Sequence, residues 1–562
     1  MSLLKKIVLA TLALVYGASL FSLAIPFATR DGLFVSPDEH ATWTFARRIA
    51  ETGIAQIEET RNISLDGSLH PRSTVTVNDV IVPAGFLGLT YLAGVFFFVS
   101  PLLAACVGPL FCILGLFALY KIVRFLGASQ EFAAWTVVAL AIHPAWWYYS
   151  IRSLMPNVPF VALLLGTGWV TTIALKSKQT VSRCLLWILI GSLFGSALAI
   201  RPSEWVWILG CLFAGVCYLI QAHKNVLRET LSKRKKEIAC FLFGVGLMGG
   251  LVLALQSSVY GSPLTTGYTV DQSVWEVGGS ISRDTVVPWY EKLFAILFPF
   301  GIHERATLTN MWRYIVVLYP VMTGVGVLGV FIWMGEKRQQ IKDERYHNLS
   351  SAVCCLLSLS ISLLYLLVLY GSWVFYDNPD QSIVSLGNSH TRYWLPIFVL
   401  LAPAIAYALQ RGRDLFIGWS QSERTKRLAY VFPAAILVLM AACSAHLVFL
   451  GDDGVLHTRE ALTTFAEKRA AILNATPEDA IIIVDRADKY LWPDRAVIVP
   501  FRSEETYTKI PELLGTAPVY YFGITLPEED LAYLHEVLFV DTGITFTSVV
   551  TIQEETLYEI SR

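Results

Sequence analysis

The sequence predicts an all-α polytopic membrane domain followed by a small C-terminal α/β domain. Of its 562 residues, 55% are hydrophobic and only 15% are charged, and the mean hydropathy is +0.54. Uncharged runs near the ~20-residue length of a transmembrane helix recur along the chain. After Phe449 the composition changes to acid-rich sequence with short apolar runs. These observations exclude an ordinary soluble protein. Nucleic-acid binding is not predicted either, because the soluble part carries no stripe of basic residues.

The number of spans depends on Val80–Tyr120, which is apolar and long enough for two crossings. Its first half, Ile81–Val99, could instead lie along the outer interface or re-enter. With one crossing, every basic-rich loop is cytoplasmic, as the positive-inside rule requires; with two, all would lie outside. We therefore predict about eleven spans, with the N-terminus inside and the C-terminus outside. The predicted spans are Met1–Pro26, Pro101–Tyr120, Phe132–Tyr149, Val158–Leu175, Cys184–Ile200, Trp205–Ile220, Ile238–Leu255, Trp312–Met334, Ala352–Trp373, Tyr393–Leu409 and Tyr430–Phe449.

This topology divides the chain into two domains. Residues 1–450 form the transmembrane domain, in which residues 28–100 are the first extracytoplasmic loop. Residues 451–562 form an extracytoplasmic α/β domain. In it, Ala480–Arg486 ("AIIIVDR") and Ala517–Ile524 ("APVYYFGI") are typical of buried strands, whereas "REALTTFAEKRAAIL" is typical of an amphipathic helix.

Adjacent carboxylates follow the first apolar segment, in Ser36-Pro37-Asp38-Glu39-His40. Two acids at a membrane surface are costly to desolvate, so they indicate a functional role. They could supply a general base and a partner for a cation, or a pair of metal ligands. The alternative is a solvated loop that happens to carry two acids.

The predicted topology also gathers arginines on the extracytoplasmic face. They are Arg152, Arg201, Arg305 and Arg392. Several guanidinium groups on one face suggest a bidentate cradle for a phosphate group at headgroup depth. For each arginine alone, the alternative is snorkelling, or pairing with an acid such as Glu204.

Further candidate substrate-binding residues stand in short motifs on the same face. His70 and Arg72 belong to "LHPRS", Asn157 closes "PAWWYYSIRSLMPN", and His390 and Tyr393 belong to "SHTRYWLP". No histidine pair has zinc-helix spacing, and the nine cysteines show no zinc-type pairing. We therefore predict no metal site and no required cofactor, although a divalent cation at the acidic pair stays open.

These motifs occur in an order that resembles the C-type (GT-C) superfamily of integral-membrane glycosyltransferases. The order is an acidic pair after the first span, a His-Pro dipeptide, the "PAWWYYSIRSLMPN" stretch, and "RYWLP" opening a late span. The protein O-mannosyltransferase and lipid A aminoarabinose transferase branch is the most similar. The resemblance implies a polyprenyl-phosphate-linked sugar donor, extracytoplasmic transfer with inversion, and a catalytic acid at Asp38 or Glu39.

Two positions depart from the family pattern. The mannosyltransferases usually carry His-Pro-Pro where this chain has His70-Pro71-Arg72, which leaves the acceptor class open. No second Asp-x-Asp follows Arg152, where oligosaccharyltransferases carry acids; Asn157 stands nearby. This departure argues against a strongly metal-dependent mechanism.

We therefore expect a multi-pass glycosyltransferase of the cell membrane. It would transfer a sugar from a polyprenyl-phosphate donor to a protein, lipid or cell-envelope glycan. The alternatives are a lipid-linked sugar transporter or flippase, and a non-catalytic subunit of a cell-envelope complex. A transporter should carry ionisable residues or broken helices near mid-membrane, whereas the charges here lie almost entirely in loops and at span ends.

Overall fold

The computed structural model describes residues 13–29, 32–222, 234–270, 289–343, 349–375, 377, 380, 382–419 and 423–562. The start of the predicted first span and the basic loops at 223–233 and 344–348 lie outside these residues. The chain forms two compact units. The first comprises Met1–Leu20, Gly108–Leu251 and Trp275–His457, and the second Phe21–Val107, Val252–Val274 and Thr458–Arg562. The predicted domain division at residue 450 stays a prediction.

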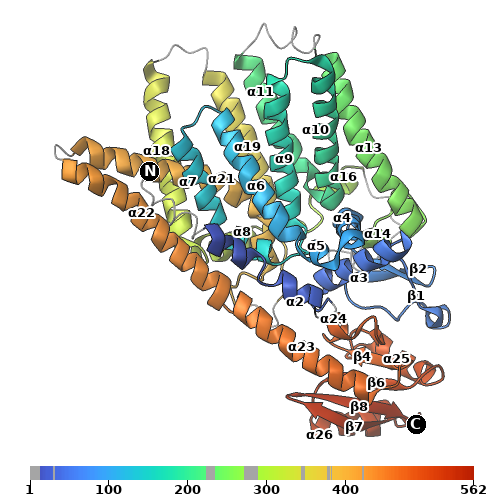
Figure 1. Cartoon of the computed structure of the whole chain (residues 1–562). Helices are drawn as coiled ribbons and strands as arrows, with labels where there is room; N and C mark the ends of the chain where they lie inside the picture. The colour runs from blue at the N-terminus through green and yellow to red at the C-terminus, as the bar shows by residue number, and fades with distance from the viewer. Residues whose placement is uncertain are drawn as a thin grey trace. The chain divides into compact units, whose positions relative to one another are not determined.

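The first unit is built from helices, many of them long (Figure 1). Its elements are α6 (Val107–Phe125), α7 (Gln130–Ala141), α8 (Pro144–Ile151), α9 (Asn157–Lys176), α10 (Thr180–Ile200), η2 (Pro202–Glu204), α11 (Trp205–Ala222), α13 (Lys235–Tyr260), α16 (Trp289–Leu297), α17 (Glu304–Met311), the π-helical turn η3 (Trp312–Val317), α18 (Pro320–Asp343), α19 (Leu349–Gly371), α20 (Ser389–Tyr393), α21 (Leu395–Trp419), α22 (Glu423–Ala445) and the π-helical turn η4 (His446–Leu450).

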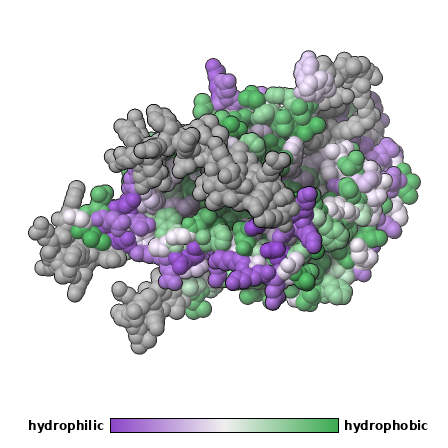
Figure 2. Space-filling view, turned by 90° about the horizontal axis from the view of Figure 1, so that it is seen from above, coloured by the Kyte–Doolittle hydropathy of each residue, from purple (hydrophilic) through white to green (hydrophobic). Residues whose placement is uncertain are grey.

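Six helices of the described residues are long and apolar enough to cross a membrane, or up to seven if a bent pair counts as one span. The bent pair joins Glu304–Val317 to Pro320–Glu336 at 99°. Large apolar side chains on α13, including Leu242, Phe243 and Leu247, are exposed, as on a lipid-facing helix. Figure 2, a view from above, shows patches of hydrophobic residues alternating with hydrophilic ones. The predicted set of long apolar helices is thus present, while the count of eleven spans and their direction stay predictions.

Helices α10 and α13 approach closely at glycines. A Cβ on Gly191 would lie 2.1 Å from the carbonyl oxygen of Phe241, and one on Gly244 would lie 2.2 Å from that of Ile188. Small residues allow helix backbones in a membrane to pack this tightly, where burial of apolar surface gives little driving force. These two glycines therefore account for the α10–α13 contact.

The second unit combines the first loop with the C-terminal residues. From the first loop come α2 (Ala24–Thr29), α3 (Pro37–Thr52), β1 (Ile57–Glu58), η1 (Thr60–Ile63), β2 (Thr74–Val77), β3 (Val80–Pro83), α4 (Leu87–Val99) and α5 (Pro101–Ala105); α14 (Gly267–Val270) joins them. Strands β1, β3 and β2 form a small antiparallel sheet. Helix α4 has 13 residues, or about 20 Å, which is short of the ~30 Å hydrocarbon core. This length favours the prediction that Ile81–Val99 does not cross.

The C-terminal part carries the predicted small sheet. Its elements are α23 (Val455–Ala475), β4 (Ile481–Val484), α24 (Asp488–Leu491), β5 (Ala496–Ile498), α25 (Glu504–Leu513), β6 (Val519–Ile524), α26 (Glu528–Tyr533), the π-helical turn η5 (Leu534–Leu538), β7 (Thr545–Ile552) and β8 (Glu555–Ser561). The strand order is β5-β4-β6-β8-β7, parallel across β5, β4 and β6 and antiparallel beyond. The two predicted strands are β4 and β6, and the predicted helix is α23.

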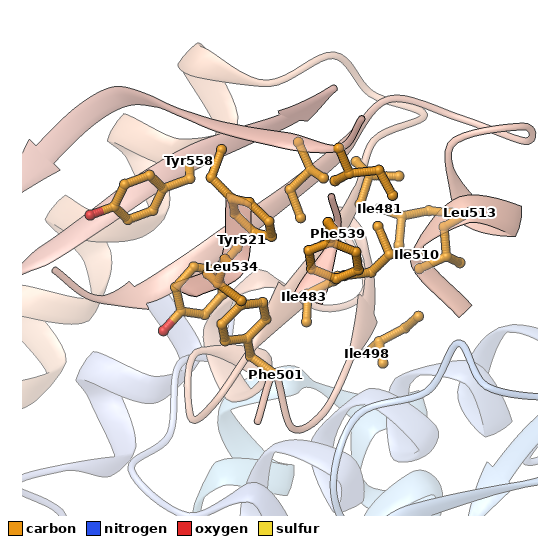
Figure 3. Packing of buried hydrophobic residues seen from close by; sticks show 14 of the residues in the cluster. Ile481, Ile483, Ile498, Phe501, Ile510, Leu513, Tyr521, Leu534, Phe539 and Tyr558 are labelled. Carbon is orange, nitrogen blue, oxygen red and sulfur yellow. The ribbon is translucent and has the colours of Figure 1, made fainter. Parts of the chain in front are cut away.

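The core of this sheet is apolar and aromatic. Ile481 and Ile483 of β4 and Tyr521 of β6 are fully buried and pack with Phe501 and Ile510 (Figure 3). The Phe501 and Tyr521 rings stack with centroids 3.9 Å apart. Two residues of the first loop, Leu65 and Leu69, belong to the same buried cluster. The first loop and the C-terminal sheet therefore share one hydrophobic core.

Candidate active site

The acidic pair lies in the first turn of α3. Ser36 is the N-cap residue, and its hydroxyl accepts a hydrogen bond from the backbone N–H of Asp38 at 3.3 Å. Pro37 occupies the first helical position, where its missing N–H costs nothing. Asp38 and Glu39 follow, where the helix dipole favours negative charge. The helix start therefore holds both carboxylates at a defined place.

The two acids differ in exposure. Asp38 is half-buried, and its Oδ1 accepts a hydrogen bond from the Ser73 hydroxyl at 2.6 Å. Glu39 is fully buried, with 0% of its surface exposed. A base must reach the proton that it abstracts, so Asp38 is the better placed of the two. Glu39 is better suited to orientation than to proton transfer.

His40 closes this turn of helix. Its Nε2 lies 2.8 Å from the carbonyl oxygen of Trp492, and its Nδ1 lies 3.4 Å from that of Gly32. The shorter distance indicates that the proton sits on Nε2 and is donated to Trp492. Burial lowers the pKa of His40, so the ring is neutral at neutral pH, although the two carbonyl oxygens act in the opposite direction.

The "LHPRS" motif lies in the same unit. Arg72 forms an ion pair with the fully buried Asp488, at 2.6 Å between Nη2 and Oδ1. The Nδ1 atom of His70 lies 3.1 Å from the carbonyl oxygen of Pro71 and 3.4 Å from the Thr74 hydroxyl. The ion pair with Asp488 therefore compensates the charge of Arg72, which needs no phosphate as a counter-ion.

In the first unit, α20 carries Arg392 and Tyr393. The Arg392 side chain is 9% exposed, and its Nη2 donates to the Ser389 hydroxyl at 2.8 Å. The Asp377 carboxylate holds Ser389 in turn, accepting from its backbone N–H at 2.7 Å. The Nη1 atom of Arg392 points to the Met155 sulfur at 3.0 Å, close in sequence to Arg152. The guanidinium plane is therefore held in place by neighbouring side chains.

Arg201 reaches the same helix through an aromatic ring. Its guanidinium carbon lies 4.5 Å from the Tyr393 ring centroid. It also forms a buried ion pair with Glu204 at 2.6 Å, and Tyr370 donates to the same carboxylate at 2.6 Å. The pairing with Glu204 is the alternative raised for this arginine from the sequence. The charge of Arg201 is therefore compensated by Glu204, and its guanidinium group packs against Tyr393. This arrangement suits a structural role better than phosphate binding.

Arg152 and Asn157 are both buried. The Nη1 of Arg152 donates to the Tyr148 hydroxyl at 2.8 Å, and the residue is 6% exposed. Asn157 is the first residue of α9, and its Oδ1 has no hydrogen-bond partner among the described residues. Arg152, Arg201, Arg392 and Tyr393 thus belong to one unit, while Asp38, Glu39, His70 and Arg72 belong to the other.

Arg305 lines a pocket of about 260 Å³ within the first unit. Arg305, Thr309 and Arg313 follow one another at helical spacing along α17 and η3, and His390 and Asp380 line the pocket as well. Burial lowers the pKa of His390 to about 4, so it is neutral at pH 7. The positive charge of the pocket therefore comes from its arginines.

Three residues of these clusters were not singled out from the sequence. Ser73 and Asp488 hold the acid-bearing loop, and Asp377 holds Ser389. The spacing Ser36-x-x-Glu39 matches a capping box and could have placed both acids in a first helical turn. No sequence signal joins Asp488 to Arg72, because 416 positions separate them. Within the described residues, no group of three or more His, Cys, Asp or Glu side chains is placed to hold a metal ion.

The chain resembles solved membrane glycosyltransferase structures. Crystalline ArnT from Cupriavidus metallidurans bound to undecaprenyl phosphate matches with a TM-score of 0.51 and 13% identity, over 99% of this chain and 98% of that one. The chain has the GT-C fold. ArnT in the apo state matches at a TM-score of 0.47, 12% identity and 98% coverage of both chains. An Archaeoglobus fulgidus oligosaccharyltransferase in complex with zinc and sulfate matches at 0.48 and 11%, over 91% of this chain and 67% of that one.

No protein-family model and no curated protein sequence matches the chain. The structural similarity to ArnT establishes the fold. Together with the apolar helices, this fold indicates a multi-pass membrane protein. The GT-C resemblance read from the motifs is confirmed at that level.

Proposed function

We propose that this chain is a membrane glycosyltransferase that moves a sugar from a polyprenyl-phosphate donor to an extracytoplasmic acceptor. The observation that carries the proposal is the ArnT-like fold over 99% of the chain, in a structure where ArnT holds undecaprenyl phosphate. The buried arginines of the first unit and the acid at the start of α3 supply the matching chemistry. About eleven spans, with the N-terminus inside and the C-terminus outside, put both on the extracytoplasmic face.

Asp38 is the proposed base. Its carboxylate takes the proton of the acceptor hydroxyl or amine, and the freed electron pair forms the bond to the anomeric carbon. The bond from that carbon to the phosphate oxygen breaks, its electrons leave with the polyprenyl phosphate, and the configuration inverts. A positioned base contributes about 10²–10⁴-fold to such a step.

Arg392 and Arg152 are the proposed ligands of the donor phosphate. Negative charge builds on the phosphate oxygens as the glycosidic bond breaks, and fixed guanidinium groups match those oxygens in pairs. Both arginines are buried, and the Ser389 and Tyr148 hydroxyls accept hydrogen bonds from them. Arg201 and Arg72 are bound to the carboxylates of Glu204 and Asp488, so they are less suited to a phosphate. Arg305, His390, Tyr393 and Asn157 are proposed to line the space for the sugar or the acceptor.

Binding of undecaprenyl phosphate in detergent tests the donor class without knowledge of the sugar. Wild type, Arg392→Lys and Arg152→Lys are compared with Arg413→Lys, a matched control whose arginine is also 9% exposed but pairs with Glu131 and Asp414. We expect Arg392→Lys and Arg152→Lys to lose about tenfold or more in affinity. Lysine keeps the positive charge, but it lacks the paired planar N–H donors of the guanidinium group. Unchanged affinity in both would refute the cradle, and no binding by wild type would refute the donor class.

A further inference from the structure

The C-terminal residues contact the first loop at two places that are linked to the acidic pair. Helix α24 and the residue that follows it supply these contacts, and α24 packs against α3. One contact is the carbonyl oxygen of Trp492 with His40, which directly follows Glu39. The other is the Asp488 carboxylate with Arg72, which directly precedes Ser73. All of these residues belong to the second unit.

Asp488 binds both the backbone and the side chain of Arg72. Its Oδ2 accepts from the Arg72 backbone N–H at 3.0 Å, and its Oδ1 accepts from Nη2 at 2.6 Å and Nε at 3.1 Å. The Asp488 side chain is fully buried, whereas that of Arg72 is 34% exposed. A carboxylate with this many charge-assisted bonds has a fixed orientation, so it fixes the backbone of Arg72.

The next residue turns into an unusual conformation. Ser73 has a φ of 62°, in the left-handed region that non-glycine residues rarely adopt. Such a conformation persists only where the surroundings impose it, and it is enriched at functional sites. Asp488 holds the preceding N–H, and the Ser73 carbonyl oxygen accepts from the Ala84 backbone N–H at 3.1 Å. In this backbone conformation the Ser73 hydroxyl donates a hydrogen bond to Asp38 Oδ1 at 2.6 Å.

The rest of the loop is anchored in the same place. Leu65 and Leu69 lie in the hydrophobic core of the C-terminal sheet. Arg61 donates from Nη1 to the carbonyl oxygen of Asp479 at 2.6 Å, and Lys509 donates to the Ser68 hydroxyl. The loop that ends at Ser73 therefore takes its shape from the C-terminal residues.

We propose that Asp488 and Ser73 are positioning residues, through which the C-terminal domain sets the place of the catalytic base. Asp488 fixes Arg72, Arg72 fixes the turn at Ser73, and Ser73 holds Asp38. The C-terminal domain is then part of the catalytic apparatus and not only a separate binding module. This inference rests on the proposed function, in which Asp38 is the base.

The test uses full-length protein in detergent and three variants. Asp488→Asn removes the charge at constant size, and Ser73→Gly removes the hydroxyl while easing the left-handed backbone. Asp485→Asn is the matched control: it lies three positions before Asp488, and its carboxylate accepts from Phe501 N–H and the Tyr521 hydroxyl within the C-terminal domain. The probe is whichever undecaprenyl-phosphate sugar wild type consumes fastest among mannose, glucose, galactose, arabinose and aminoarabinose.

We expect kcat to fall about 10- to 100-fold in Asp488→Asn and Ser73→Gly, because a displacement of about 1 Å costs that much. Donor KM should stay within about twofold in both variants, because neither residue belongs to the proposed phosphate cradle. Hydrogen exchange should speed up at residues 70–76 in Asp488→Asn, and kcat of Asp485→Asn should match wild type.

The outcomes separate the two proposals. If Asp38→Asn abolishes turnover while Ser73→Gly and a folded Asp488→Asn keep wild-type kcat, the positioning role is wrong and the proposed base stands. If kcat of Asp485→Asn falls as far as kcat of Asp488→Asn, any loss of charge in the C-terminal domain has this effect. The specific positioning of Asp38 through Arg72 and Ser73 is then wrong. If Asp38→Asn keeps full turnover, the proposed base itself fails. Should Asp488→Asn not fold, Ser73→Gly decides the question, because it leaves no buried charge unpaired.

Discussion

Loss of the buried ion pair between Arg201 and Glu204 should destabilise the folded chain. Their side chains are 7% and 2% exposed, and Arg201 Nη2 lies 2.6 Å from Glu204 Oε1. The Tyr370 hydroxyl donates to the same oxygen at 2.6 Å, and the Trp207 indole N–H donates to the other. Glu204→Gln keeps the size of the side chain and leaves Arg201 as a buried charge with no counter-ion in this group.

Removing one partner of a buried ion pair costs about 3–5 kcal/mol, because the remaining charge loses its compensation. The matched control is Glu131→Gln, whose carboxylate is 44% exposed and pairs with Arg413, an arginine that keeps Asp414 as a second partner. A surface ion pair contributes about 0–1 kcal/mol, and the loss here should lie near that range because Glu131 is exposed and Arg413 keeps Asp414. We therefore expect a difference of about 2 kcal/mol or more between the two variants.

The assay is unfolding by sodium dodecyl sulfate in mixed micelles, followed by tryptophan fluorescence. If Glu204→Gln unfolds at the same detergent fraction as wild type, or as Glu131→Gln, the pair carries no net stabilisation and the assignment of Arg201 as a support for Tyr393 is wrong. Binding of undecaprenyl phosphate by folded Glu204→Gln, measured alongside, should change less than in Arg392→Lys.

Two further predictions concern pH and topology. The pKa of His390 is about 4 in the folded chain, against about 6.5 unfolded, so the unfolded state binds more protons between these values. Stability should fall by up to about 3 kcal/mol as pH drops from 6.5 to 4, and His390→Gln should remove most of that fall; an equally steep fall in the variant would contradict it. A reporter fused after Arg562 should be active only outside the cytoplasm, and activity confined to the cytoplasm would overturn the predicted orientation.

Much of the fold follows from local signals in the sequence. Uncharged runs near the spanning length predict membrane helices such as α9 and α10, because a helix of about 20 residues crosses the bilayer and satisfies its backbone hydrogen bonds within the segment. The apolar stretches at Ala480 and Ala517 predict β4 and β6. The span count is harder to predict, since Val80–Tyr120 divides into a strand, the short helix α4, α5 and the longer α6.

The candidate site is only partly predictable, since residue types are visible in a sequence and partners are not. Asp38 and Glu39 stand out as charges beside a membrane segment. The burial of Glu39 and the pairing of Arg72 with Asp488 depend on tertiary packing. The Arg201–Glu204 pair spans only three positions, so the sequence could raise it as an alternative. The sequence also gives no sign that the first loop shares a core with residues 458–562, because that packing joins segments about 400 positions apart.

Donor consumption by wild type and Asp38→Asn shows most directly whether this chain is a glycosyltransferase with Asp38 as its base. Purified protein is mixed with undecaprenyl-phosphate mannose, glucose, galactose, arabinose or aminoarabinose and a cell-envelope extract as acceptor source, and released undecaprenyl phosphate is measured. We predict release from at least one donor by wild type, a fall of about 10²–10⁴-fold in Asp38→Asn because its proton acceptor is lost, and a smaller fall in Glu39→Gln. Release undiminished in both variants, or no release by wild type from any donor, would contradict the account.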